Sequence, residues 1–192
     1  AYATGRANLN IGGFNQTVGR IRSVSLALPQ LISSPTPAIL TINQNINDLF
    51  RGQFTNAIGI VKQGAGTLTL TNAYHFFSGP VTVREGQLEL LAGASLGSAC
   101  TNLTVSGGIL SAAGNGAWSR NAYLSLAGTG KVQLAAGTRQ EALQLFVNGV
   151  LQPSGTYGSS TSTAQHPDDV HFTGTGVVFV RRGYPSTRLI LR

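Results

Sequence analysis

The sequence predicts an all-β fold, a right-handed parallel β-helix (β-solenoid) in which short strands coil around one elongated core. First, residues 67–70, 81–83 and 87–90 (TLTL, VTV and QLEL) alternate apolar with Thr or Glu side chains, the period of a strand with one buried face. Second, Gly, Pro, Asn and Ser turns separate these strands, and no helical period is present. Third, whole phrases recur at roughly 20-residue intervals, as in stacked coils that bury their apolar faces together.

An antiparallel β-sandwich is the alternative fold. It also produces short strands at regular spacing with turn residues between them. The repetition of whole phrases, and not of strands alone, favours the solenoid.

Residues 1–58 are expected to form an N-terminal β segment of the solenoid. Within it, residues 9–21 are typical of strand, Gly-Gly turn and strand, and residues 38–42 (AILTI) of a further strand. The Asn-rich stretch that follows could be taken for a helix, but its composition favours strand and turn. Prolines cannot donate to a ladder, so an unbroken ladder is not expected across Pro29, Pro35 and Pro37.

Residues 59–147 are expected to form the solenoid repeats. The predicted strands are a first series at 67–70, 87–90, 107–110, 124–126 and 143–147, with intermediate strands at 81–83, 103–105 and 131–134. The strongest helix candidate, residues 139–145, is short and is better interpreted as a corner that leads into a strand.

Residues 148–180 are predicted to close the fold, and residues 181–192 to form a basic tail. Asn148-Gly149 is a favourable hairpin dipeptide. A polar loop at 159–169 precedes a last strand pair that ends at 177–180.

Composition favours an extracellular β protein. Charged residues are 10% of the 192, and glycine contributes 25 residues. Cys100 is the single cysteine, which excludes an intrachain disulfide and predicts a small buried hydrophobe. The chain contains no methionine, so Ala1 is expected to be the start of a processed piece of a longer product. No apolar run approaches the roughly 18 residues of a membrane span.

The net charge of +7 is concentrated at the C-terminus. One interpretation is a grip on an anionic partner, such as nucleic acid, lipid head groups or acidic polysaccharide, and the other is a solvated terminus. Basic clusters interleaved with aromatic residues are absent elsewhere, so no nucleic-acid partner is expected. The last twelve residues contain no acid and four arginines, Arg181, Arg182, Arg188 and Arg192.

The chain has six acidic residues, too few and too dispersed in sequence to predict an active site built on carboxylates. Polysaccharide-cleaving β-helices need clustered carboxylates, and Glu85 and Glu89 lie on either side of a Gly turn, where they are not expected to converge. The segment His166-Pro-Asp-Asp-Val-His171 could offer His166, Asp168 and His171 to a metal. Their spacing fits no strong metal template, and a structural loop is the preferred interpretation, so no catalytic residue, metal or cofactor is expected.

Histidine and aromatic residues elsewhere have ordinary structural interpretations. His75 is expected to be a partly exposed turn residue. An aromatic strip for sugar rings is conceivable, but stacked core aromatics explain the same residues: Tyr74, Phe76, Phe77, Trp118 and Tyr123.

Residues 62–97, KQGAGTLTLTNAYHFFSGPVTVREGQLELLAGASLG, resemble the autotransporter-associated β-strand repeat of bacterial passenger regions. The resemblance rests on the Lys, the Gly-x-Gly, the TLTL strand, an aromatic near a Gly turn, and the final strand pair. Residues 9–21, 145–160 and 168–180 resemble segments that flank such repeats. The resemblance implies an exported β-helix at the bacterial surface, with an architectural role and no catalytic residues.

The predicted function is therefore a non-enzymatic extracellular structural or adhesive module. A short solenoid exposes strand edges at its ends, which favours a homo-oligomer or a head-to-tail filament. The alternative is a β-helix that binds or cleaves polysaccharide. A third hypothesis is docking of the arginine tail onto acidic surface polymers.

Overall fold

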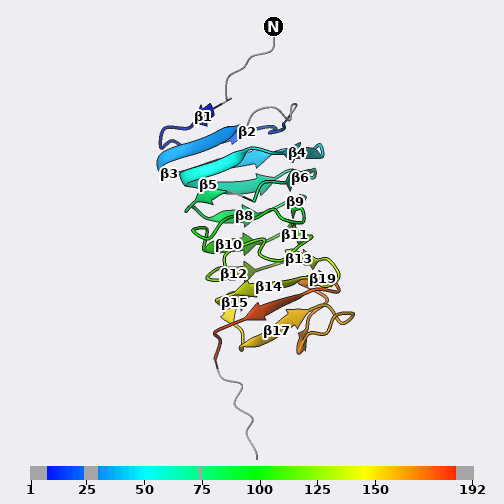
Figure 1. The fold of residues 1–192 in the computed structure, drawn as a ribbon. Helices are drawn as coiled ribbons and strands as arrows, with labels where there is room; N and C mark the ends of the chain where they lie inside the picture. Colours follow the sequence, from blue (N-terminus) through cyan, green and yellow to red (C-terminus); the bar gives the residue numbers. More distant parts are fainter. Residues whose placement is uncertain (1–7, 24–29, 74, 185–192) are drawn as a thin grey trace, which may run out of the picture.

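The computed structural model describes residues 8–23, 30–73 and 75–184, and they form a β-solenoid of about six turns. The coils stack into a rod with the N-terminal coils at one end and the C-terminal coils at the other (Figure 1). The described residues contain no helix, and so none long and apolar enough to cross a membrane.

Two sheets run along the rod, and a third is confined to its C-terminal coils. The first has the path β1-β3-β5-β8-β10-β12-β15-β16, with β2 beside β3 and β7 beside β5. Its strands are β1 (Asn8–Asn10), β2 (Gln16–Val18), β3 (Leu31–Asn43), β5 (Gln53–Gln63), β7 (Phe76–Phe77), β8 (Val81–Val83), β10 (Asn102–Val105), β12 (Tyr123–Leu126), β15 (Gln144–Val147) and β16 (Val150–Leu151).

The second sheet has the order β19-β13-β11-β9-β6-β4 and the third β14-β20-β17-β18. The second contains β4 (Asp48–Phe50), β6 (Thr67–Leu70), β9 (Gln87–Leu90), β11 (Ile109–Ala112), β13 (Lys131–Leu134) and β19 (Phe172–Gly174). The third contains β14 (Arg139–Ala142), β17 (Gly155–Gly158), β18 (His166–Pro167) and β20 (Val177–Val180).

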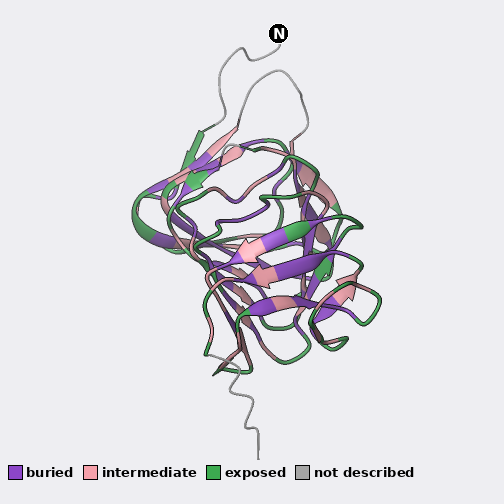
Figure 2. Cartoon of the chain, turned by 60° about the horizontal axis from the view of Figure 1, so that its bottom comes forward, coloured by how far each residue is buried: buried purple, intermediate pink, exposed green. Residues whose placement is uncertain are grey.

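Side chains from successive coils pile up in one continuous core, which confirms the predicted parallel β-helix and excludes the sandwich. Pairing between strands is parallel, apart from β15 with β16 and β17 with β20 among the described residues. Buried residues line the inside of the coils (Figure 2). Two columns in register are at most 1% exposed: Val81, Leu103, Leu124 and Leu145 in the first sheet, and Leu68, Leu88, Leu110 and Val132 in the second.

The structure corrects the sorting of strands between sheets. The TLTL strand, β6, pairs with β9, which pairs with β11, which in turn pairs with β13. The prediction for β13 (KVQL) is therefore wrong, because it assigned this strand to the intermediate series. Residues 124–126 and 143–147 belong to the first sheet with VTV. All these strands have the same apolar alternation, so their pattern carries no information on which side of the rod they occupy.

The proline-containing segment is also more regular than expected. β3 begins at Leu31 and passes through Pro35 and Pro37, while its pairing with β5 shifts register between Ser34 and Ala38. The ladder is thus interrupted at the prolines, as predicted, but the strand continues on both sides. Pro29 lies outside the described residues, and the boundary expected after residue 58 lies inside β5.

Two predictions for the C-terminal coils have different outcomes. The hairpin is confirmed, because β15 pairs antiparallel with β16 around Asn148 and Gly149, which have φ values of 49° and 79°. The expected corner at 139–145 is wrong in part, since Arg139–Ala142 forms β14 and pairs with β20.

Lys62 joins the corners of two successive coils. It occupies an inward position of β5 in register with Ile42 and Val83, and its side chain is fully buried. Its Nζ donates to the carbonyl oxygens of Gln63 and Gly64 at 2.7 Å, and to that of Glu85 at 3.4 Å. Burial lowers the pKa of the ammonium to about 8, against the opposing charge of Glu85.

Lys62→Met is expected to lower the free energy of unfolding by about 2 kcal/mol, because the three carbonyl oxygens lose their donor in a buried corner. Lys131→Met is the matched control, since its Nζ makes an exposed bond to the carbonyl of Asp169. Urea unfolding at neutral pH measures both. Equal effects of the two substitutions would contradict the bridging role.

Candidate functional site

The six acidic side chains of the chain are dispersed among separate partners. Glu85 and Glu89, four residues apart, accept from the backbone N–H of Gly64 at 3.1 Å and the hydroxyl of Thr69 at 2.8 Å, respectively. The other contacts are Asp48 with Arg20, Glu141 with Arg120, Asp168 with His171 and Asp169 with the backbone N–H of Ser160. Each carboxylate is thus held in a contact of its own, including the adjacent pair Asp168 and Asp169.

The predicted metal candidates are only partly brought together. Asp168 Oδ2 lies 2.8 Å from His171 Nδ1, and its Oδ1 accepts from the backbone N–H groups of Val170 and His171. His166 instead stacks on Tyr157, with ring centroids 4.7 Å apart. Within the described residues, no three His, Cys, Asp or Glu side chains are grouped to hold a metal ion. The contacts of Asp168 are those of a side chain that stabilises a turn.

The predicted arginine cluster begins as an extension of a strand. The backbone N–H groups of Arg181 and Arg182 donate to the carbonyl oxygens of Ala142 and Leu143, so these residues continue the ladder of β20 along β14. Arg188 and Arg192 lie outside the described residues.

His75 was expected to be partly exposed and is instead in the core, 1% exposed. Its ring lies 5.4 Å from that of Phe54 and 6.2 Å from that of Phe77, and its Nδ1 accepts from the backbone N–H of Phe54 at 3.0 Å. Its Nε2 is buried without a hydrogen-bond partner. Burial lowers the pKa of His75 to about 4. The signal was in the sequence: His75 and Phe77 have the same parity, and therefore share a face.

The five aromatic residues considered for a sugar-binding strip do not share one surface. Phe77 and Trp118 are buried, whereas Phe76 and Tyr123 are exposed. Tyr74 lies outside the described residues. Cys100 is also fully buried, as expected, and burial raises the pKa of its thiol to about 12.

The N-terminal end of the rod has an open edge. Both β1 and β2 pair with β3, and within the described residues no strand pairs with their outer edges. A cavity of about 450 Å³ opens at the same end. Its lining includes the apolar side chains of Leu9, Ile21, Leu31, Ile32 and Phe50. The sequence did not predict this cavity, because the cavity depends on which coil lies at the N-terminal end of the rod.

Arg20 fastens the segment beside this cavity. Its guanidinium contacts Asp48 of β4 through two nitrogens, at 2.5 and 2.7 Å. The hydrogen bonds from Arg20 hold the pKa of the Asp48 carboxyl below its usual value. This ion pair therefore fixes Arg20, which lines one side of the cavity, to β4.

The C-terminal end is closed differently. The first sheet ends in β16, which pairs antiparallel with β15. In the third sheet, β17 pairs antiparallel with β20. The edge strands β16 and β18 are two residues long. The edge of the second sheet at this end, β19, is three residues long and pairs parallel with β13. The C-terminal end thus combines short reversed edges with one short parallel edge, which makes it different from the N-terminal end.

Comparison with known proteins finds a family model that matches one stretch of the chain. Residues 60–90 match the passenger-associated-transport-repeat, in agreement with the expected resemblance at 62–97. This stretch runs from β5 through β6, β7 and β8 to β9, and so covers one full coil and the start of the next. No curated protein and no solved structure matches the chain significantly.

Proposed function

We propose, from the passenger-associated-transport-repeat at residues 60–90 and its place in a solenoid, that this chain is a non-enzymatic structural module of an extracellular passenger. Its role is to present the sides of a rod at the cell surface. Such a module needs a continuous core, and the two buried columns supply it without any disulfide.

The separate anchoring of the carboxylates supports the non-enzymatic role. Hydrolysis or elimination at a sugar needs two groups aimed at one reacting centre. Here Asp168 and Asp169 are the nearest pair in sequence, yet one contacts His171 and the other Ser160. This arrangement speaks against the alternative of a polysaccharide-cleaving β-helix.

The unpaired N-terminal edge is the observation that carries a second part of the proposal, self-association. Among the described residues no strand pairs with the outer edges of β1 and β2, which lie beside an apolar cavity, and a second copy of the chain can cover both. Two N-terminal ends that meet form a closed pair. A head-to-tail filament would instead use the short C-terminal edges, β16 of two residues and β19 of three, so the closed pair is the arrangement that we propose.

The test compares one substitution at each end. Leu9→Glu places a charge in the N-terminal cavity, whose lining includes the 43% exposed Leu9, and Val150→Glu places one on β16, where Val150 is 59% exposed. Light scattering over a range of concentrations gives the mass, and electron microscopy gives the shape.

We expect a concentration-dependent dimer that Leu9→Glu abolishes and Val150→Glu leaves intact. Filaments that either substitution breaks would establish the head-to-tail arrangement instead. A monomeric mass at every concentration would refute self-association, and circular dichroism confirms that both variants remain folded.

A further inference from the structure

The outer face of the third sheet carries a group of arginines around one aromatic ring. Along β14, Gln140 and Ala142 are buried, so Arg139 and Glu141 face outward. Glu141 is in register with Phe179 of β20, which faces outward between the buried Val178 and Val180. The Arg139 guanidinium lies 4.5 Å above the centre of the Phe179 ring.

The preceding coil contributes to the same surface. Arg120 is 66% exposed, and its Nε lies 3.7 Å from Glu141 Oε2. The next residue, Asn121, accepts from Arg181 Nη1 at 3.2 Å, and Arg182 follows at the same edge. Three segments far apart in sequence thus bring together the third-sheet patch, which consists of Arg120, Arg139, Glu141, Phe179, Arg181 and Arg182.

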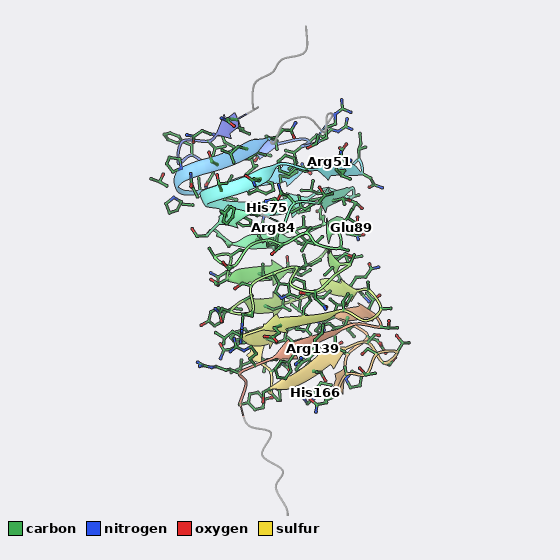
Figure 3. The ribbon with its side chains drawn as sticks, in the orientation of Figure 1. Arg51, His75, Arg84, Glu89, Arg139 and His166 are labelled. Carbon is green, nitrogen blue, oxygen red and sulfur yellow. The ribbon has the colours of Figure 1, made fainter. Side chains whose placement is uncertain are left out.

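Most of the net positive charge of the described residues is in this patch. Four arginines and one glutamate give it a net charge of +3. The rest of the described residues contain six basic and five acidic side chains, a net charge of +1. Figure 3 shows Arg139 in the C-terminal half of the rod, whereas Arg51 and Arg84 lie in the N-terminal half. A concentrated excess of this kind attracts anionic partners.

Two of the guanidinium groups are already positioned, because Arg139 lies over Phe179 and Arg181 donates to Asn121. A third, that of Arg120, is paired more loosely with Glu141, at 3.7 Å. A side chain held before binding loses less conformational freedom on binding, and the guanidinium fork matches a carboxylate or sulfate in two parallel hydrogen bonds. The patch is therefore better prepared for planar acidic groups than a row of free lysines would be.

We propose that the third-sheet patch binds an acidic polysaccharide. Arginines spread over a strand and the neighbouring turns suit an extended polymer that carries a charge on successive sugars. Single-stranded nucleic acids use several open aromatic faces for base stacking, whereas Arg139 covers Phe179, the aromatic residue of the patch. This binding is separate from self-association, because it involves the sides of the C-terminal coils and not the N-terminal end.

The test uses the full 192-residue chain and immobilised polygalacturonate, with dextran as the neutral polymer. Arg120→Ser/Arg181→Ser is expected to weaken binding at low salt at least about tenfold, since two charge-assisted contacts are lost. The matched control is Arg51→Ser/Arg84→Ser, which removes the same charge from two exposed arginines elsewhere and is expected to change binding less than about twofold. Glu141→Gln is expected to strengthen binding, because it removes the acid of the patch.

Equal losses in the two double variants would show that net charge, and not the patch, determines binding. Tighter binding to an oligonucleotide or to anionic lipid vesicles would overturn the choice of polysaccharide. No binding to polygalacturonate, or equal binding to dextran, would overturn the proposal altogether. None of these outcomes depends on whether the chain dimerises.

Discussion

Gly79→Ala is expected to lower the free energy of unfolding by about 3 kcal/mol or more, the largest effect of any single methyl group considered for this chain. Gly79 lies between β7 and β8, where the corner of one coil passes over the previous coil. A Cβ atom there would lie 2.2 Å from the carbonyl oxygen of Ile58 and 2.5 Å from the backbone nitrogen of Gly59. Both are backbone atoms, which cannot move aside as a side-chain end can.

Gly19→Ala provides a matched control for this prediction. A Cβ at Gly19 would meet nothing within 4 Å, and neither glycine has a positive φ that would penalise alanine. The control is therefore expected to be neutral or slightly stabilising. Chemical denaturation of the two variants gives the comparison. If Gly79→Ala unfolded at the same denaturant concentration as the wild type, the close stacking of this corner on Ile58 would be wrong.

Acidification from pH 6.5 to pH 4 is expected to remove about 3 kcal/mol of stability through His75 alone. Its pKa is about 4 in the folded chain, because burial disfavours the charged ring, and 6.5 in an exposed chain. Between these values the unfolded chain binds a proton that the folded chain does not, so stability falls as the pH falls. The gap between the two pKa values corresponds to the stated free energy.

His75→Asn separates this contribution from those of other groups. The asparagine oxygen can still accept from the backbone N–H of Phe54, but the side chain no longer titrates. The variant is expected to be less stable at neutral pH, owing to lost contacts with Phe54 and Phe77, and to change little between pH 6.5 and pH 4. A wild-type slope in His75→Asn would assign the acid sensitivity to another group.

Much of the local structure could be predicted, because it follows from the alternation of apolar and polar side chains and from the residues in the turns. TLTL, VTV and QLEL are strands at the predicted residues, and the Asn148-Gly149 hairpin forms as expected. The parallel stacking followed from phrases that repeat, since each coil needs its neighbours to cover its apolar face.

The candidate surfaces were much less predictable. The sequence singled out Arg181 and Arg182 but could not associate them with Arg120 and Arg139, which are more than 40 residues away and meet them through parallel pairing of β14 with β20. It also predicted a partly exposed His75, because a histidine among turn residues resembles an exposed one until the direction of its side chain is known.

The sequence by itself determined the parallel solenoid and its passenger-type repeat, because alternation is visible within one coil and repetition in the comparison of successive stretches of the chain. Only the tertiary structure decided which strands share a side, which end stays open and where the charge gathers. Those properties depend on the register between coils, and register arises from packing between residues about 20 positions apart. No single stretch of the chain contains that information.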